Sequence, residues 1–342
     1  MKSAHLDTFV ADRLPPAHEQ PEFLFDLPEL RYPERLNAAV ELIDRAADPD
    51  APAVINDAGC WSYAEMADRS DRIARILAEE EGLVPGNRVL LLGPNTAMLF
   101  AAWLGILKAA GVVVAAMPIL RAGEIATILD KAQVSHAIVD SRFADAFDQA
   151  AASTGLAKSV LRYDGDTGGA MASRIADAAP GFTAIDTHRD DPALIAFTSG
   201  TTGKPKGCVH FHRDILAPAD SFSRHVLQPQ PGQRWACSAP LAFTFGLGML
   251  LIFPWRSGGA AVTIEKPGPD PLLAAIETHR INLLATAPTA YKTLLGKLGG
   301  ADISSLESCV SAGEHLPETV WHAWHEATGI GIIDGIGATE MM

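Results

Sequence analysis

Short apolar runs alternate with segments of helical periodicity in the first half of the chain. Residues 88–93 form an apolar run closed by Gly, and the helical segment 97–109 and the apolar run 112–115 follow it. A second helix is expected at 122–132, and it leads into a strand at 136–140. This succession predicts an α/β fold whose sheets are mostly parallel and covered by helices on both faces.

Two helix boundaries can be read from local signals. Ser62 precedes a helical pattern and is followed three residues later by Glu65, which predicts a capping box at the start of a half-buried helix. An earlier helix is expected over 38–47, because the sequence Asp-Pro-Asp-Ala-Pro at 48–52 ends it.

The pattern divides the chain into four parts. Residues 1–37 contain Pro and aromatic residues without periodicity and are expected to lie as an arm over the surface. Residues 38–163 form a first α/β subdomain, and residues 164–191, rich in Gly, Ala, Asp and Thr, form a linker region. Residues 192–342 form a second α/β subdomain, which we expect to be incomplete at its C-terminal end.

Within the second part, polar residues follow several expected strands. A strand is expected at 208–212, and the segments 283–288 and 308–313 repeat a pattern of strand, turn and helix. Each turn would deliver polar groups to the same edge of a sheet, which is where open α/β sheets bind ligands.

Composition narrows the class of protein. With 342 residues, 48% of them hydrophobic, the chain can bury a large core, and its net charge of −14 argues against a nucleic-acid partner. No signal peptide is evident, and the most apolar stretch, 98–118, contains Lys108 and Gly111, so we expect no membrane segment. The four cysteines have no paired spacing, which predicts neither a zinc site nor disulfides and favours a cytoplasmic location.

The strongest chemical signal is the segment 198–207, Thr-Ser-Gly-Thr-Thr-Gly-Lys-Pro-Lys-Gly. It follows the apolar run 193–197, so a buried strand would feed a loop that offers hydroxyl groups, backbone N–H groups and positive charge. A polyphosphate requires these groups. The segment differs from the loop of P-loop NTPases, because only two residues separate Gly200 from Gly203 and Pro205 follows Lys204. The alternative is a surface loop rich in turn-forming residues.

Two later segments support the first in order and spacing: Ser-Ala-Gly-Glu at 311–314 and Asp-Gly-Ile-Gly-Ala-Thr-Glu at 334–340. Together the three resemble the motifs of the adenylate-forming superfamily, which includes acyl-CoA and aryl-CoA ligases, luciferases and peptide-synthetase adenylation domains. The opening residues 8–37 resemble 2-aminobenzoate-CoA ligases and benzoate-CoA ligases. The resemblance implies the large N-terminal domain of such an enzyme, without the small C-terminal domain that carries a catalytic lysine in the family.

The resemblance also implies roles for individual residues. Catalytic roles fall on Thr198, Lys206, Thr339 and Glu340, with Glu340 as the ligand of Mg²⁺, a hard cation that prefers carboxylate oxygen. Lys204 either assists in phosphate binding or is a solvated loop charge. The residues expected to bind ATP are Thr198, Ser199, Gly200, Thr201, Thr202, Gly203, Lys206, Gly313, Glu314, Asp334, Gly335 and Thr339.

A further set is expected to line the acid-binding pocket: Phe243, Gly246, Ala312 and Gly337. Many family members have His where this chain has Phe243, and benzoate-type ligases carry an aromatic residue there. An apolar wall suits an aryl ring, which gains from stacking and burial. The alternative is that Phe243 and Phe245 are core residues.

The function implied by the resemblance is ATP-dependent activation of an aromatic acid, 2-aminobenzoate, to an aryl-adenylate, followed by thioester formation with CoA. Two alternatives stay open: a ligase for a different carboxylic acid, and a non-catalytic fragment that binds nucleotide or acyl acid. The missing domain also predicts self-association, or a C-terminal domain supplied by another chain.

Histidine pairs offer a different chemistry. His210 and His212 share one face of an expected strand, and His322 and His325 lie three apart on an expected helix. Neither pair has an evident third ligand, so we expect both to be structural rather than metal sites.

Overall fold

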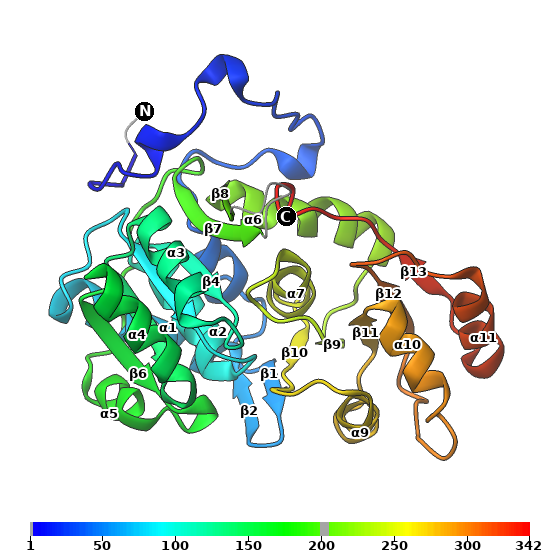
Figure 1. Cartoon of the computed structure of the whole chain (residues 1–342). Coiled ribbons are helices and arrows are strands. Elements are labelled where there is room, and N and C mark those ends of the chain that lie inside the picture. Colours follow the sequence, from blue (N-terminus) through cyan, green and yellow to red (C-terminus); the bar gives the residue numbers. More distant parts are fainter. Residues whose placement is uncertain (1–2, 199–204) are drawn as a thin grey trace.

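Two β-sheets, both mainly parallel, organise the chain in the computed structural model, which describes residues 3–198 and 205–342 (Figure 1). The six-stranded sheet has the order β6-β5-β3-β4-β7-β8, with only β8 antiparallel to its neighbour. Its strands are β3 (Arg88–Leu92), β4 (Val112–Ala116), β5 (His136–Asp140), β6 (Ser159–Tyr163), β7 (Pro192–Thr198) and β8 (Lys206–Phe211).

The seven-stranded sheet has the order β13-β12-β11-β9-β10-β1-β2, and only β2 runs antiparallel to its neighbour. Its strands are β1 (Pro52–Asn56), β2 (Gly59–Ser62), β9 (Arg234–Cys237), β10 (Ala260–Val262), β11 (Leu283–Thr286), β12 (Ser308–Ser311) and β13 (Ile332–Asp334). The expectation of mostly parallel sheets with helical cover is therefore confirmed.

Helices and sheets alternate in layers because both faces of each sheet are apolar. On β3, Val89 and Leu91 belong to a central core shared by both sheets, whereas Leu90 and Leu92 belong to an outer core. A third core covers the outer face of the seven-stranded sheet. The result is a helix–sheet–helix–sheet–helix arrangement. The helices in these layers are α3 (Ala122–Ala132) and α4 (Ala144–Thr154) outside the first sheet, α1 (Tyr63–Arg75), α2 (Ala97–Lys108) and α8 (Phe253–Arg256) in the centre, and α9 (Pro269–His279), α10 (Pro288–Leu295) and α11 (Glu318–Thr328) outside the second.

Shorter elements complete the connections. The remaining α-helices are α5 (Gly169–Asp177), α6 (His212–Pro218) and α7 (Thr244–Leu247). Wide π-helical turns occupy Val40–Asp44, Ile76–Glu80, Ala219–Leu227 and Gly248–Ile252. Single 3₁₀ turns occupy Ala11–Arg13, Ala17–Glu19, Pro28–Leu30, Ser141–Phe143 and Gly165–Thr167.

Local signals located the early elements well. The capping box is formed as expected, since the Ser62 side chain accepts from the Glu65 amide and the Glu65 carboxylate accepts from the Ser62 amide. The expected helix at 122–132 and strand at 136–140 have the observed bounds. The helix expected over 38–47 is shorter, because its last turn is the π-helical Val40–Asp44 and the chain leaves it at Arg45.

The two sheets do not follow the expected division of the chain. Residues 164–191 contain α5, which buries Met171 and Ile175 in the central core, so this region is more than a linker. Strands β7 and β8, which come after it, pair with the first sheet, while β1 and β2 from the early chain join the second. Hydrogen-bonding partners, which local composition does not reveal, set this arrangement.

Helix α2 lies wholly inside the central layer, and all of its residues are buried. The one charged residue on it, Lys108, is fully buried, and its ammonium group lies 2.6 Å from the Asp44 and Asp71 carboxylates. Because an unpaired buried charge is costly, these contacts allow a lysine to end a helix in an apolar core.

The N-terminal arm, blue in Figure 1, crosses the molecule above β7 and β8. Asp7 pairs with the buried Arg88 at the start of β3, and the Tyr32 hydroxyl donates to Asp220 over 2.9 Å. Near the start of the arm, the Ala4 amide donates to the Asp191 carboxylate over 3.0 Å. The arm is thus fixed to the start of β3, to the residue that precedes β7 and to the π-helical turn Ala219–Leu227.

Candidate functional site

The segment expected to hold phosphates, 198–207, begins at the end of β7 and continues into β8. Thr198 ends β7 and pairs with Lys206, the first residue of β8. The remaining candidates of this segment lie outside the described residues: Ser199, Gly200, Thr201, Thr202, Gly203 and Lys204. Lys206 is exposed at the start of its strand, so its ammonium group is accessible to an anion.

Strand β8 joins this segment to the C-terminal motif. Alternate residues of a strand share a face, which places Lys206, Cys208 and His210 together. The buried ring of His210 lies with Nε2 2.7 Å from the carbonyl oxygen of Thr339. Figure 1 shows the C-terminal end, in red, beside β8 and α6. The Thr339-Glu340 pair is therefore anchored next to the strand that carries Lys206.

The pKa of the Cys208 thiol is affected by burial and by the charges of both Glu340 and Lys206. Burial raises the pKa of Cys208, the carboxylate of Glu340 raises it further, and the ammonium group of Lys206 opposes the rise. One side chain thus lies within electrostatic range of both residues. Both the Glu340 carboxylate and the Lys206 ammonium group are exposed. A carboxylate and an ammonium group close to the same strand suit the binding of a phosphate together with a metal ion.

The second part of the candidate site is the edge of the seven-stranded sheet at which its parallel strands have their carboxyl ends. Ser238 after β9 and Thr286 at the end of β11 share a hydrogen bond of 2.5 Å. The next strand ends at Ser311, whose buried hydroxyl has no hydrogen-bond partner among the described residues, and β13 ends at the exposed Asp334. The polar edge expected at these turns is therefore present.

The two glycine motifs meet at this edge. The Gly335 amide donates to the Ser311 carbonyl over 2.8 Å, which holds the segment after β13 against β12. Gly313 adopts φ +92°, a conformation that favours glycine, so the chain can turn sharply at the site. Glu314 accepts from the Thr289 amide and hydroxyl, and these hydrogen bonds lower the pKa of the Glu314 carboxyl.

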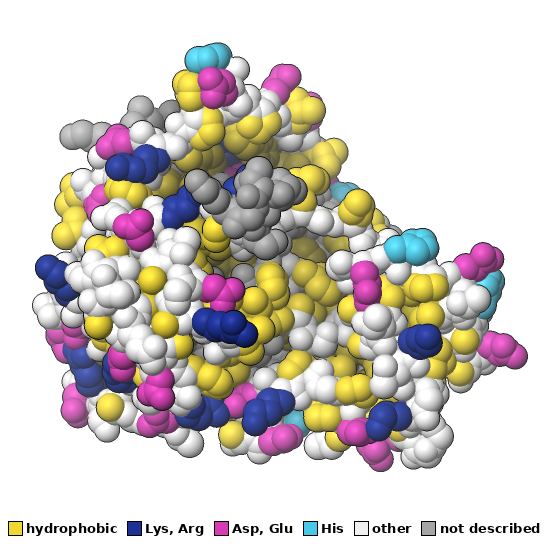
Figure 2. Space-filling model, in the orientation of Figure 1, with side chains coloured by type: hydrophobic (Ala, Val, Ile, Leu, Met, Phe, Trp, Pro, Cys, Tyr) yellow, Lys and Arg dark blue, Asp and Glu magenta, His cyan; other side chains and the backbone are white. Residues whose placement is uncertain are grey.

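The expected acid-binding residues differ in their surroundings. Phe243, just before α7, is 43% exposed and is not a core residue. Ala312 is half-buried and Gly337 is exposed, whereas Gly246 is buried in α7. A Cβ on Gly246 would lie 2.1 Å from the Pro240 carbonyl oxygen, so close packing of α7 requires glycine at this position. In Figure 2 the face is hollowed between the two sheets, and hydrophobic side chains border the hollow.

Asn95, which the sequence did not single out, positions this segment. The Asn95 amide group donates to the Ala239 carbonyl over 3.1 Å and accepts from the Leu241 amide over 2.8 Å. The residue is 5% exposed and follows β3, so it connects the first sheet to the chain leading to Phe243. Its place at the carboxyl end of a strand is the one signal that could have identified it.

The two histidine pairs lie in different settings, and His212 is not on a strand as expected, because β8 ends at Phe211. His212 begins α6, and its Nδ1 accepts from the Ala38 amide over 3.2 Å, while His210 contacts Thr339. His322 and His325 contact the Trp321 ring on α11. Within residues 3–198 and 205–342, no group of three or more His, Cys, Asp or Glu side chains could hold a metal ion. None of the helices in this described part is long and apolar enough to span a membrane.

Comparison with known proteins decides the family. The model of the AMP-binding enzyme family matches residues 43–342. The chain belongs to this family. It is 32% identical to a benzoate–CoA ligase of Thauera aromatica over 321 residues, which cover 92% of the chain and 61% of that relative. It is 37% identical to an anthranilate–CoA ligase of Pseudomonas aeruginosa over 158 residues, which cover 45% of the chain and 30% of that relative.

Solved structures agree with this assignment. The anthranilate CoA ligase AuaEII in complex with anthranoyl-AMP superposes with a TM-score of 0.87 at 28% identity, covering 92% of this chain and 61% of that one. The fold is therefore that of the N-terminal domain of an adenylate-forming enzyme. The chain spans about 60% of the length of the curated relatives first matched.

Proposed function

We propose that this chain is the part of an aryl-CoA ligase that binds ATP and an aromatic acid, with 2-aminobenzoate as the acid. The reaction is attack of the carboxylate on the α-phosphorus of ATP, with release of pyrophosphate, to give an aryl-adenylate. Transfer of the acyl group to CoA follows. This proposal agrees with the relatives, whose names specify benzoate and anthranilate as the acids.

One observation carries the proposal. The 2.7 Å contact between His210 and Thr339 brings the C-terminal motif to the strand that begins with Lys206. Two segments separated by more than 100 residues thereby offer positive charge, a hydroxyl group and a carboxylate at one place. Since phosphoryl chemistry depends mainly on positioning and electrostatics, this convergence suits a bound nucleotide.

Roles for the described residues follow from their charge and position. Lys206 offsets the negative charge of the β- and γ-phosphates, and Thr198 lies opposite it on β7. The hydroxyl of Thr339 donates to the α-phosphate. Gly313, Glu314, Asp334 and Gly335 lie on the adenine and ribose side. There the glycine backbone permits a close approach, and Glu314 holds the turn through Thr289.

Glu340 is the residue that would hold Mg²⁺. Its carboxylate is exposed at the site, and Mg²⁺ commonly takes one or two carboxylates together with substrate phosphates and water. When bound, the ion would neutralise part of the phosphate charge. A carboxylate in this position fits an ion that arrives with the nucleotide.

The acid-binding residues favour an aromatic substrate. Phe243 presents an exposed ring that can stack on an aryl group, and the small residues Ala312 and Gly337 would leave space for the substrate. The Ser311 hydroxyl, next to Ala312 in the chain, is buried and has no hydrogen-bond partner among the described residues, so a polar ring substituent reaching it would satisfy it. These features support an aromatic acid with a polar substituent such as the amino group of 2-aminobenzoate.

The proposal is tested by exchange of labelled pyrophosphate into ATP, with 2-aminobenzoate, benzoate, 3-hydroxybenzoate, a short fatty acid or no acid. Exchange that depends on an aromatic acid, and is largest with 2-aminobenzoate, is expected of a chain competent in the first half-reaction. Titration calorimetry with ATP and Mg²⁺, followed by each acid, provides the second reading. Binding of both without exchange would identify a nucleotide- and acid-binding unit. The absence of any ATP binding would refute the proposal.

A further inference from the structure

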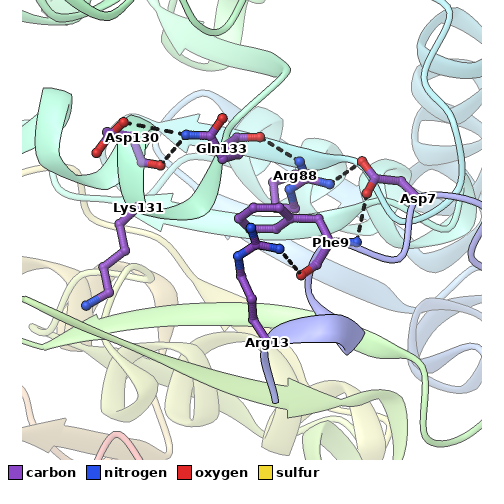
Figure 3. Close-up of a pocket in the computed structure, with 7 residues that line it drawn as sticks. All are labelled: Asp7, Phe9, Arg13, Arg88, Asp130, Lys131 and Gln133. Atoms are coloured by element: carbon purple, nitrogen blue, oxygen red, sulfur yellow. Dashed lines mark hydrogen bonds and ion pairs between the residues drawn. The ribbon is translucent and has the colours of Figure 1, made fainter. Parts of the chain in front are cut away.

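A surface pocket of about 530 Å³ lies between the N-terminal arm, the start of β3 and the end of α3 (Figure 3). This volume is within the about 300–1,000 Å³ typical of small-molecule sites. The pocket uses neither Lys206 nor the C-terminal motif. Its lining residues are Asp7, Phe9, Arg13, Arg88, Asp130, Lys131 and Gln133.

Two guanidinium groups sandwich the Phe9 ring. The Cζ atom of Arg13 lies 3.7 Å from the ring centroid, and the Cζ atom of Arg88 lies 4.6 Å from it. Figure 3 shows the ring between them. Arg88 is held by Asp7 and by the carbonyl groups of Ala132 and Gln133, so its hydrogen-bonding groups are engaged within the protein. Arg88 therefore fixes the ring on which Arg13 rests.

Unlike Arg88, the side chains of Arg13 and Lys131 are available to a ligand. Arg13 is exposed, and its Nη1 donates to the Phe9 carbonyl over 3.2 Å, while the Lys131 ammonium group donates to the Pro205 carbonyl over 2.7 Å. Among the described residues, neither cation forms an ion pair with a carboxylate at 4.0 Å or less. On a chain with a net charge of −14, two such cations at one pocket form a local positive site.

Two carboxylates also line the pocket, and they differ in availability. Burial raises the pKa of the Asp7 carboxyl, but hydrogen bonds that it accepts from Arg88, the Phe9 amide and the Asn87 side chain, with the charge of Arg88, outweigh burial and lower the pKa. Asp130 is exposed and lies 3.5 Å from the Gln133 side-chain nitrogen. The charge of Asp130 therefore opposes an anion in the pocket, and its removal should strengthen anion binding.

We propose that this pocket binds a small phosphate-bearing anion through Arg13 and Lys131. A guanidinium group offers paired N–H donors that match phosphate oxygens, and an ammonium group adds a second charge from another element of the fold. Phe9 holds the guanidinium of Arg13 in place. The proposal is independent of the ligase function. The bound anion would compete with the Pro205 carbonyl for Lys131, next to the first residue of β8.

The test is calorimetric titration with inorganic phosphate at constant ionic strength, using the chain with the Lys206→Gln substitution so that the nucleotide site contributes less. Arg13→Gln and Lys131→Gln should each weaken the phosphate affinity by about tenfold, as expected for loss of one charge-assisted contact. Asp130→Asn should increase the affinity severalfold. Lys292→Gln, at an exposed position on α10 outside the seven-stranded sheet, is the matched control and should leave the affinity unchanged.

The gain expected from Asp130→Asn protects the test against misfolding, because a damaged protein would lose affinity rather than gain it. Circular dichroism melting of each variant provides a further check. The proposal is overturned if no saturable phosphate binding occurs. It is also overturned if the binding that occurs is insensitive to Arg13→Gln and Lys131→Gln, or falls equally with Lys292→Gln.

Discussion

The Nε2 atom of His210 on β8 lies 2.7 Å from the carbonyl oxygen of Thr339, 129 residues further along the chain. Burial lowers the pKa of His210, so the ring is neutral at pH 7 and can donate to a carbonyl only with its proton on Nε2. The contact thus depends on one tautomer of a buried side chain. It links the strand of Lys206 to the carboxylate of Glu340.

Replacing His210 by Ala should weaken ATP binding by about tenfold, because the Thr339 carbonyl loses its donor and the C-terminal motif loses its anchor. His210→Gln should recover part of the affinity, since its side-chain amide can donate to the same carbonyl. Titration calorimetry with ATP and Mg²⁺ measures the effect. His322→Ala, at an exposed position on α11, is the control, and an equal loss in that variant would contradict the prediction.

Replacing Phe243 by Ala should weaken binding of an aromatic acid by about tenfold, through loss of stacking and burial. The free energy of unfolding should change little, because the side chain is 43% exposed. Phe23 on the arm is also 43% exposed, so Phe23→Ala is a matched control. Acid binding is measured by titration in the presence of ATP. Unchanged affinity in Phe243→Ala would remove this residue from the pocket.

Replacing Asn95 by Ala should lower both the stability of the protein and its affinity for the acid. Two backbone groups, the Ala239 carbonyl and the Leu241 amide, would lose their partner, at a cost of about 1–3 kcal/mol in unfolding free energy. Asn95→Asp keeps the acceptor for the Leu241 amide but loses the donor for the Ala239 carbonyl. Its stability and its affinity for the acid should therefore lie between those of the parent chain and Asn95→Ala. Urea unfolding and acid titration on all three proteins give this order. A wild-type acid affinity in Asn95→Ala would show that the segment is held by other contacts.

Replacing Lys108 by Met should destabilise the protein by about 2–3 kcal/mol, somewhat less than the ~3–5 kcal/mol typical of breaking a fully buried pair. The reduction is expected because the Asp44 and Asp71 side chains are 30% and 19% exposed, so water can solvate them in part. Urea unfolding measures the change. Lys158→Met, at an exposed position, should alter stability by less than about 0.5 kcal/mol. An unchanged free energy of unfolding in Lys108→Met would show that the ion pairs contribute no net stability.

Stability should also fall in mild acid. Burial lowers the pKa of His212 from 6.5 to about 3, with a smaller contribution from the charge of His5. His212 is therefore protonated near pH 6.5 in the unfolded chain but only near pH 3 in the folded chain. The stabilisation is complete above pH 6.5 and is lost as the pH falls toward 3, with a slope of up to about 1.4 kcal/mol per pH unit for this residue.

His212→Asn tests this pH dependence, since its side-chain oxygen can accept from the Ala38 amide without titrating. Its free energy of unfolding should decline less steeply between pH 6.5 and 4 than that of the parent chain. His18→Asn, on the exposed arm, should keep the parent slope. Identical slopes for His212→Asn and the parent would assign the acid sensitivity to other groups.

Local sequence signals predicted much of the fold and part of the site. The capping box at Ser62, the alternation of strands and helices and the polar turn after Ser311 all depend on neighbours within a few residues, so they can be read from the chain itself. Sheet membership depends on partners far away. The pairing of β1 with β10, for instance, joins Val54 to Ala261 and has no local signature.

The same reasoning applies to the site. Lys206 stands in a segment whose composition indicates phosphate binding, and the resemblance to adenylate-forming enzymes implies roles for Gly313 and Glu340, so the sequence could propose all three. The contribution of Asn95 and His210 lies in contacts with backbone atoms of distant segments, and any polar side chain of suitable shape could supply them. Such positioning residues become visible only when the chain is folded.

The interleaving of β1 and β2 with late strands has a consequence for synthesis on the ribosome. The hairpin of residues 52–62 emerges early, but its neighbour in the sheet, β10, follows about 200 residues later. Until then the hairpin has an unpaired edge, and the apolar face that it presents to the central core is uncovered. The nascent first half therefore cannot complete its fold alone. We expect this nascent segment to stay partly folded, or to be bound by a chaperone, until translation passes Val262.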